Sequence, residues 1–99
     1  MSRNEPDWRP QLFCPRCKAS IVWPLSLSAD DKARTATEVR ASAMAGAKWL
    51  HERFGLELGE AKALSFHVTR TVGQCHRCHR ALQGEASICR QCRSANLDW

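Results

Sequence analysis

Cys75-His76-Arg77-Cys78 opens the stretch of sequence that decides the fold, and Cys89-Arg90-Gln91-Cys92 closes it. Two residues separate the cysteines of each pair, a spacing that lets both sulfurs of a tight turn point at one metal ion. Ten residues separate Cys78 from Cys89, which is enough for a small hairpin that turns near Gly84. We therefore predict that Cys75, Cys78, Cys89 and Cys92 form one closed structural site with four sulfur ligands.

Zinc is the ion that this pattern favours. A rubredoxin-like iron site would use the same four-sulfur geometry, but its cysteine pairs usually lie much farther apart. Free thiols or two disulfides are less favoured, because residues 1–7 show no signal-peptide pattern and the expected location is the reducing cytoplasm. No apolar run approaches the roughly 18 residues that a membrane span needs, so we expect no membrane association.

A third pair, Cys14 and Cys17, has no fourth pair to complete a second site. Three interpretations are open. A histidine on the predicted helices, His51 or His67, completes a second zinc site; the pair joins one of the later pairs; or it is an unmetallated remnant or a redox dithiol. The sequence does not separate the first two interpretations, so it predicts one zinc ion and leaves a second open.

No constellation of catalytic residues is evident. The sequence lacks a glycine-rich phosphate loop, a nucleophile elbow and paired carboxylates that flank a cleft. A catalytic zinc needs an open coordination position, which only a site built on Cys14, Cys17 and a histidine would offer. We therefore predict that the protein is not an enzyme. His76, inside a knuckle loop, is expected to face solvent rather than bind metal, and His79 only to form a hydrogen bond.

Residues 28–54 carry the longest helical signal. Ser28 and Asp31 fit a capping box in its acidic form, and Gly55 is well placed to end the helix. Apolar positions recur every three or four residues and predict one buried stripe: Ala36, Val39, Ala43, Ala47, Leu50 and Phe54. A second helix is expected over residues 60–69, so that the two helices form a hairpin.

The predicted fold is mainly α with small β, a helical hairpin plus zinc ribbon and knuckles. Residues 1–12 are expected to be a flexible N-terminus, 13–27 a cysteine knuckle and short strand, 28–72 the helical hairpin, and 73–99 the zinc ribbon. Trp23 and Trp49 are expected to fill the small core between hairpin and ribbon. Trp8 and Trp99 lie near the termini and are candidates for contact residues.

The chain carries 15 basic and 10 acidic residues, a formal charge of +5. A basic balance of this kind is typical of nucleic-acid-binding proteins. Metal-bound cysteines are thiolates, however, so one zinc site with four sulfurs lowers the net charge to about +3. Along the sequence the charges are spread evenly. The arginines near the C-terminal cysteines are expected partly to offset the thiolates: Arg77, Arg80, Arg90 and Arg93.

Residues 47–64 resemble the helical hairpin in the C-terminal domain of the bacterial ribosomal stalk protein. The matching positions are Lys48, Gly55, Leu56, Leu58, Glu60, Ala61 and Lys62. His51 and Gly59 depart from the family, which has arginine and lysine there. In that family this face binds translation factors, so the resemblance implies a similar hairpin and partner-binding roles for Lys48 and Lys62.

The C-terminal part looks like short zinc ribbons, including the Com translational regulators of Mu-type phages, which bind messenger RNA. The residues that carry this likeness are Cys75, Cys78, Leu82, Gly84, Glu85, Cys89, Cys92 and Asn96. Many unrelated ribbons share this pattern, so it supports the metal far more than the RNA.

Together these patterns favour a non-catalytic, zinc-stabilised adaptor that binds another protein in a translation-related setting. One alternative is a zinc ribbon that binds RNA or DNA. A weaker one is a thiol redox or metal-responsive protein that uses Cys14 and Cys17. Binding to phosphates weakens steeply with salt, whereas an apolar contact between proteins does not, so salt dependence separates the first two functions.

Overall fold

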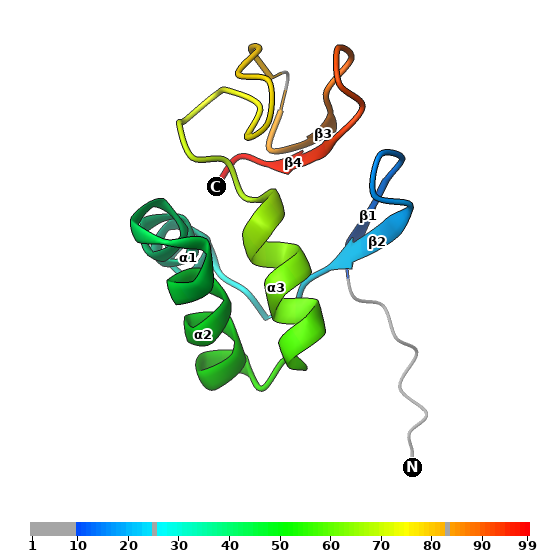
Figure 1. Ribbon diagram of the computed structural model, residues 1–99. Helices are drawn as coiled ribbons and strands as arrows, with labels where there is room; N and C mark the ends of the chain where they lie inside the picture. Colours follow the sequence, from blue (N-terminus) through cyan, green and yellow to red (C-terminus); the bar gives the residue numbers. More distant parts are fainter. Residues whose placement is uncertain (1–9, 25, 83) are drawn as a thin grey trace.

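The computed structural model describes residues 10–24, 26–82 and 84–99 (Figure 1). In these ranges the fold is mainly α with small β, as predicted: three helices and two antiparallel sheets of two strands each. The elements in chain order are β1 (Gln11–Cys14), β2 (Ala19–Val22), α1 (Ala29–Ala41), α2 (Ala43–Phe54), α3 (Leu58–His67), β3 (Ala86–Ile88) and β4 (Ala95–Leu97). No helix within the described ranges is both long enough and apolar enough to cross a membrane.

The prediction of a single helix over residues 28–54 was wrong, because the helix is interrupted at Ser42. There the backbone is extended, and the Ser42 hydroxyl accepts hydrogen bonds from the backbone N–H groups of Met44 and Ala45. Ser42 therefore ends α1 and caps α2, which is a favoured role for serine. The start and the end that the sequence predicted for this helical stretch are confirmed. Ser28 and Asp31 form the capping box, and Gly55 ends α2 with a φ of 71°.

Helices α2 and α3 approach each other closely at Gly46. A Cβ atom built there would lie 2.5 Å from Val39 Cγ2 on α1 and 2.6 Å from Ser65 Oγ on α3, so only glycine fits between the three helices. The Ser65 hydroxyl donates a 2.6 Å hydrogen bond to the carbonyl of Ala43. The second helix of the hairpin is therefore fixed against the first turn of α2, and it covers Leu58–His67 rather than residues 60–69.

Helix α3 is the centre of the molecule. It lies between α2 and the β1–β2 hairpin, and its C-terminal end meets β4 (Figure 1). Beyond the end of α3, Val68 pairs with Leu97 of β4, and the Thr69 amide donates to the Leu97 carbonyl. This arrangement buries one apolar cluster, to which both sheets and all three helices contribute residues. Its members are Ile21, Trp23, Leu27, Ala36, Val39, Ala47, Leu50, Leu56, Ala61, Leu64, Val68 and Leu97.

The tryptophans serve mainly this core. Trp23 is buried and meets Trp99 edge to face, with ring centroids 5.7 Å apart, so Trp99 packs on the core instead of being a free contact residue. Trp49 is partly buried and packs against Phe54 at the edge of the cluster. Trp8 lies outside the described residues. Strand β1 begins at Gln11, within the stretch that the sequence assigned to the N-terminal segment.

Candidate metal centres

The three cysteine knuckles share one backbone conformation. In each, the amide of the residue four places after the first cysteine donates to that cysteine's carbonyl, over distances of 2.7–3.1 Å. That donor residue also has a left-handed backbone, with φ of 57° at Lys18, 68° at His79 and 69° at Arg93. Non-glycine residues rarely adopt this conformation, and structures keep it where function requires it. The Cys14–Cys17 knuckle is therefore built like the two C-terminal knuckles.

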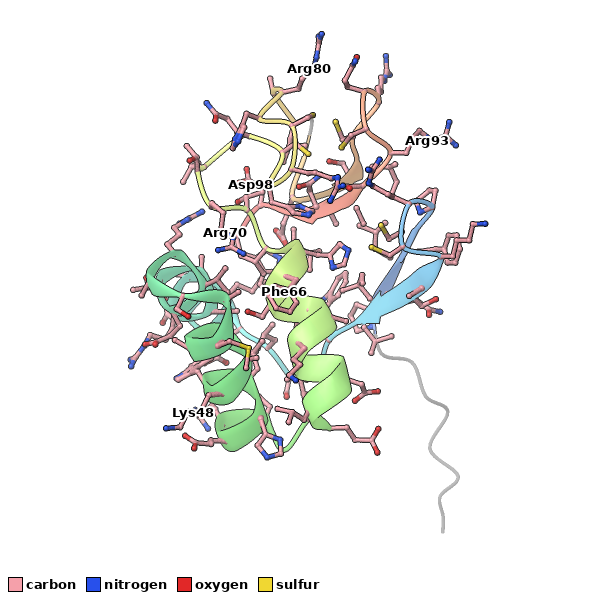
Figure 2. The ribbon with its side chains drawn as sticks, in the orientation of Figure 1. Lys48, Phe66, Arg70, Arg80, Arg93 and Asp98 are labelled. Atoms are coloured by element: carbon pink, nitrogen blue, oxygen red, sulfur yellow. The ribbon has the colours of Figure 1, made fainter. Side chains whose placement is uncertain are left out.

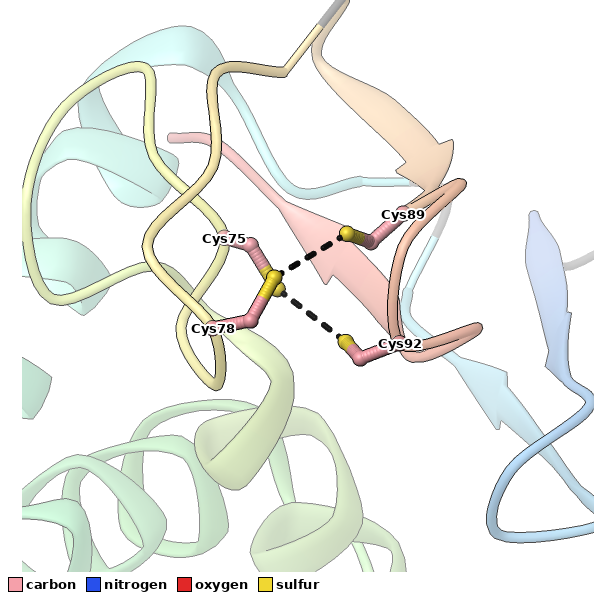
Figure 3. Close-up of side chains that lie close together, drawn as sticks. All are labelled: Cys75, Cys78, Cys89 and Cys92. Carbon is pink, nitrogen blue, oxygen red and sulfur yellow. Dashed lines mark hydrogen bonds between the residues drawn. The ribbon is translucent and has the colours of Figure 1, made fainter.

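The four C-terminal cysteines form one compact group (Figure 3). Their sulfurs all lie within 4.8 Å of one another, with Cys75 Sγ 3.6 Å from Cys92 Sγ and Cys78 Sγ 3.3 Å from Cys89 Sγ. Zinc with four sulfur ligands at about 2.3 Å places neighbouring sulfurs about 3.8 Å apart. The four cysteines therefore fit a tetrahedral zinc ion that leaves no coordination position open.

Cys75 is the most strongly supported ligand of this group. Burial alone would raise its pKa, but backbone N–H groups of Cys78 and Arg77, together with the side-chain amide of Asn96, lower the pKa of the thiol to about 6. The Asn96 amide nitrogen lies 3.4 Å from Cys75 Sγ. Since the thiolate is the form that binds metal, this knuckle already favours the ligating state.

Cys14 and Cys17 form a second group, with His67 and not with a later cysteine pair. The three ligand atoms lie within 4.8 Å of one another, and Cys17 Sγ is 3.4 Å from His67 Nε2. A tetrahedral zinc bound to one sulfur and one imidazole nitrogen separates these atoms by about 3.5 Å. The observed distance fits that arrangement. His51, the other candidate, lies instead at the α2–α3 turn, where its Nδ1 bonds the carbonyl of Leu56.

The hydrogen bond of His67 fixes which of its nitrogens is free. Its Nδ1 lies 2.7 Å from the carbonyl oxygen of Ala63, one turn earlier on α3. A carbonyl oxygen only accepts, so Nδ1 carries a proton; in the neutral ring, the form that binds metal, the lone pair is then on Nε2, which faces Cys17. Metal-binding histidines typically have such a partner on the second nitrogen. The end of α3 thus orients His67 as a metal ligand would need to be oriented.

Cys14 has the environment of a ligand as well. It is fully buried, and burial alone would raise the pKa of its thiol. The backbone N–H groups of Ala95 and Cys17 outweigh that effect and lower the pKa to about 7. The Ala95 amide belongs to β4, so the C-terminal sheet donates directly to the N-terminal knuckle. The two cysteine groups are consequently neighbours in one region of the molecule.

This region, residues 10–24 and 70–99, is called the metal end below, and residues 26–69 the helical end. The metal end contains seven basic and two acidic residues, whereas the helical end contains six of each. All seven basic side chains are exposed: Arg16, Lys18, Arg70, Arg77, Arg80, Arg90 and Arg93. Charges that are spread evenly along the sequence are therefore separated in space. Figure 2 shows Arg80 and Arg93 at the opposite end of the molecule from Lys48.

Both acidic residues of the metal end have partners. Glu85 pairs with Lys32 of α1 at 2.7 Å, and Asp98 accepts hydrogen bonds from the Thr69 hydroxyl and the Gly73 amide. The ion pairs in the described part of the chain are Lys32–Glu85 and Arg34–Glu38, so neither neutralises a basic residue of the metal end. The positive charge there faces solvent.

The partner-binding candidates of the hairpin lie on the helical end. Lys48 is exposed on α2, and Lys62 is partly exposed on α3. Each lies on a helix that also exposes large apolar side chains, namely Met44 on α2 and Leu58 and Phe66 on α3, which are 42–53% exposed. Phe66, Lys62 and Leu58 follow one another at four-residue intervals and share one side of the helix.

Asn96 and His76 are the site residues that sequence reasoning undervalued. Asn96 is fully buried, and its side-chain oxygen accepts hydrogen bonds from both the backbone N–H and Nδ1 of His76 at 2.7–2.8 Å. His76, expected to face solvent, is partly buried, and burial lowers its pKa. Its ring lies edge to face with that of His67. The signal available in the sequence was Asn96 itself, a polar residue between two apolar ones, Ala95 and Leu97, shortly after the last cysteine pair.

The comparisons with known proteins add no family: no family model, curated protein or solved structure matches the chain. What the geometry supports is therefore the metal chemistry of two Cys- and His-rich groups within a small mixed fold.

Proposed function

We propose that this protein is a non-catalytic, zinc-stabilised module that binds nucleic acid through its metal end. The observation that carries the proposal is the separation of charge. The seven exposed basic side chains of the metal end come from segments far apart in the sequence, and the helical end has no net charge. Subtracting the charge of a zinc ion with four thiolates still leaves about +3 on this end.

Folding brings arginines of the metal end together in two places. Arg16 of the N-terminal knuckle donates to the carbonyl of Cys92 in the third knuckle, and Arg16 and Arg77 both act electrostatically on Cys17. Arg80 and Arg90 line a pocket of ≈ 390 Å³ whose wall also includes Leu82 and Ile88. Guanidinium groups beside a pocket that has both polar and apolar walls suit a phosphate group.

The test is the salt dependence of binding. Affinity for short single-stranded RNA, single-stranded DNA and duplex DNA is measured by fluorescence anisotropy on the zinc-loaded protein. Three phosphate contacts predict a loss of affinity of roughly 20- to 40-fold between 50 and 200 mM salt. Absence of binding to all three at low salt would contradict the proposal.

Two matched variants each remove two positive charges, one from the metal end and one from the helical end. Arg80→Gln/Arg90→Gln should weaken binding and lower the slope of log affinity against log salt by about one to two. Lys48→Gln/Lys62→Gln removes the same charge from the helical end and should leave that slope unchanged. Equal weakening by both pairs would mean that net charge, and not the metal end, governs binding.

A second candidate function rests on side chains of the hairpin that face solvent, which are Met44 and Lys48 on α2 and Leu58, Lys62 and Phe66 on α3. Exposed apolar side chains together with two lysines suit a protein partner, with the lysines setting the rate of association more than the lifetime of the complex. This is the adaptor function that the stalk resemblance implies. Neither lysine is a partner in an ion pair of the described residues.

The adaptor function is tested by pull-down from a bacterial lysate with the wild type and with Lys48→Glu/Lys62→Glu. A ribosomal protein or translation factor captured only by the wild type supports it. An unchanged set of captured proteins, with the fold of the variant intact by circular dichroism, removes both lysines from the binding site.

A further inference from the structure

We propose that Cys14, Cys17 and His67 bind a second zinc ion, and that His76 supplies its fourth ligand. The site would join three parts of the chain: the N-terminal knuckle, the last turn of α3 and the knuckle that begins at Cys75. This zinc is separate from the ion in the four-cysteine site, and it goes beyond the proposed binding function.

Three observations point to a metal at the first three residues. Cys14 and Cys17 have the same knuckle backbone as the C-terminal pairs, including the left-handed residue that follows. The thiol of Cys14 accepts two backbone N–H hydrogen bonds in a buried position, which favours a thiolate. His67 is 6% exposed and directs Nε2 at Cys17, while the carbonyl of Ala63 accepts a hydrogen bond from its Nδ1.

His76 is placed to complete the tetrahedron. Its ring centroid lies 5.4 Å from that of His67. Two imidazoles that bind one tetrahedral zinc through Nε2, at about 2.0 Å, have centroids about 5 Å apart. The Nδ1 of His76 donates to Asn96, so its Nε2 has the lone pair available. His76 is not among the atoms that lie within 4.8 Å of one another, so binding would draw its ring toward the ion.

Asn96 would then connect the two ions. Its amide nitrogen lies 3.4 Å from Cys75 Sγ, a ligand of the first zinc, and its amide oxygen accepts from His76 Nδ1, a ligand of the second. Residues that orient metal ligands in this way usually change metal affinity by 10- to 100-fold when they are replaced. The carboxamide would therefore support both sites from one buried position.

The experiment counts zinc ions by native mass spectrometry on the reduced full chain. The wild type should hold two ions, His67→Ala one, and His76→Ala should lose the second ion to a chelator at least tenfold more readily than the wild type. Two exposed histidines serve as controls: His51→Ala and His79→Asn should both keep two ions. Asparagine is used at 79 because it tolerates the left-handed backbone.

A cobalt titration of the wild type keeps the test independent of any variant that fails to fold. Sulfur-to-cobalt charge-transfer absorption grows with the number of thiolates bound, so a second equivalent should add about half the absorption of the first. A wild type with a single ion, or a His67→Ala variant with two, would overturn the site. A His76→Ala variant that matches the wild type against the chelator would overturn the role of His76.

Discussion

The helical end and the metal end are stabilised by different means. The helical end supplies most of one apolar cluster, which includes Val39, Leu50 and Leu64 at 0% exposure. In the three knuckles the buried residues are cysteines, and the fully buried leucine of β4, Leu97, belongs to the cluster of the helical end. Burial of apolar surface therefore stabilises one end, whereas the other has almost no core of its own.

This difference shows how a short chain can hold an irregular, strongly charged surface. Segments below about 40 residues rarely bury enough apolar area to fold without metal or disulfides. A metal ion held by the four cysteines would remove that requirement for the metal end and leave its arginines free to face solvent. The helical end, in contrast, needs close packing and tolerates little change at its tightest contacts.

Cys89→Ser gives the largest expected effect and breaks the metal end alone. Loss of a four-cysteine zinc site removes on the order of 10 kcal/mol of folding free energy. Amide resonances of residues 74–96 should collapse toward random-coil positions in a two-dimensional NMR spectrum, while the far-UV helix signal persists. A metal-free variant with native amide dispersion there would show that packing, and not zinc, holds this end.

Gly46→Ala should break the helical end instead. The added Cβ overlaps Val39 and Ser65, and overpacking of this kind costs about 1–3 kcal/mol, more than the roughly 1 kcal/mol that alanine gains in helix propensity. The melting temperature should fall while the zinc count stays the same. Gly59→Ala is the control, because nothing lies within 4 Å of its Cβ position and the variant should be at least as stable as the wild type.

Ser42→Ala tests the break between α1 and α2. The hydroxyl caps two amides at the start of α2, and loss of an N-cap typically costs about 1 kcal/mol. Chemical denaturation should show this loss with an unchanged dependence on denaturant concentration. Ser42→Asp keeps a capping oxygen and should restore most of the stability; if alanine proves neutral, the cap is not what separates the helices.

Lys32→Met gives the smallest expected effect and tests the link between the two ends. Lys32 of α1 pairs with Glu85 of the metal end and lies 5.6 Å from the centre of the Trp99 ring. Exposed pairs contribute about 0–1 kcal/mol, and methionine keeps the aliphatic contact, so we expect about 0.5 kcal/mol. A loss above about 2 kcal/mol in thermal unfolding would mean that the ends depend on each other far more than the comparison implies.

Local signals in the sequence predicted local structure well. The four-cysteine group, the Ser28–Asp31 capping box and the stop at Gly55 each depend on residues close together in the chain, and all three are present. The helix break was missed although Ser42 is a good capping residue, because alanines on both sides continue the helical pattern. The alanine pattern also does not show the close packing beside the break, where Gly46 approaches Val39 and Ser65.

Long-range features were less predictable. The sequence offered His51 and His67 as equal partners for Cys14 and Cys17, and only the position of α3 separates them, since the knuckle packs beside its C-terminal end. The basic surface could not be predicted either, because it also depends on contacts between distant segments. Arg16 and the arginines of the ribbon lie more than 50 residues apart in sequence, so evenly spread charges became one positive end only after folding.

Strand β4 has three buried residues, and its two faces have different neighbours. Leu97 lies in the apolar cluster, whereas Asn96 meets Cys75 and His76. Successive strand residues face opposite sides, so inserting or deleting one residue between Cys92 and Leu97 would exchange the two faces. The carboxamide would enter the cluster, and the leucine would replace it beside the thiols. As versions of this chain diverge, substitutions can accumulate here, but gaps in an alignment should fall elsewhere, for instance at the turn near Gly84.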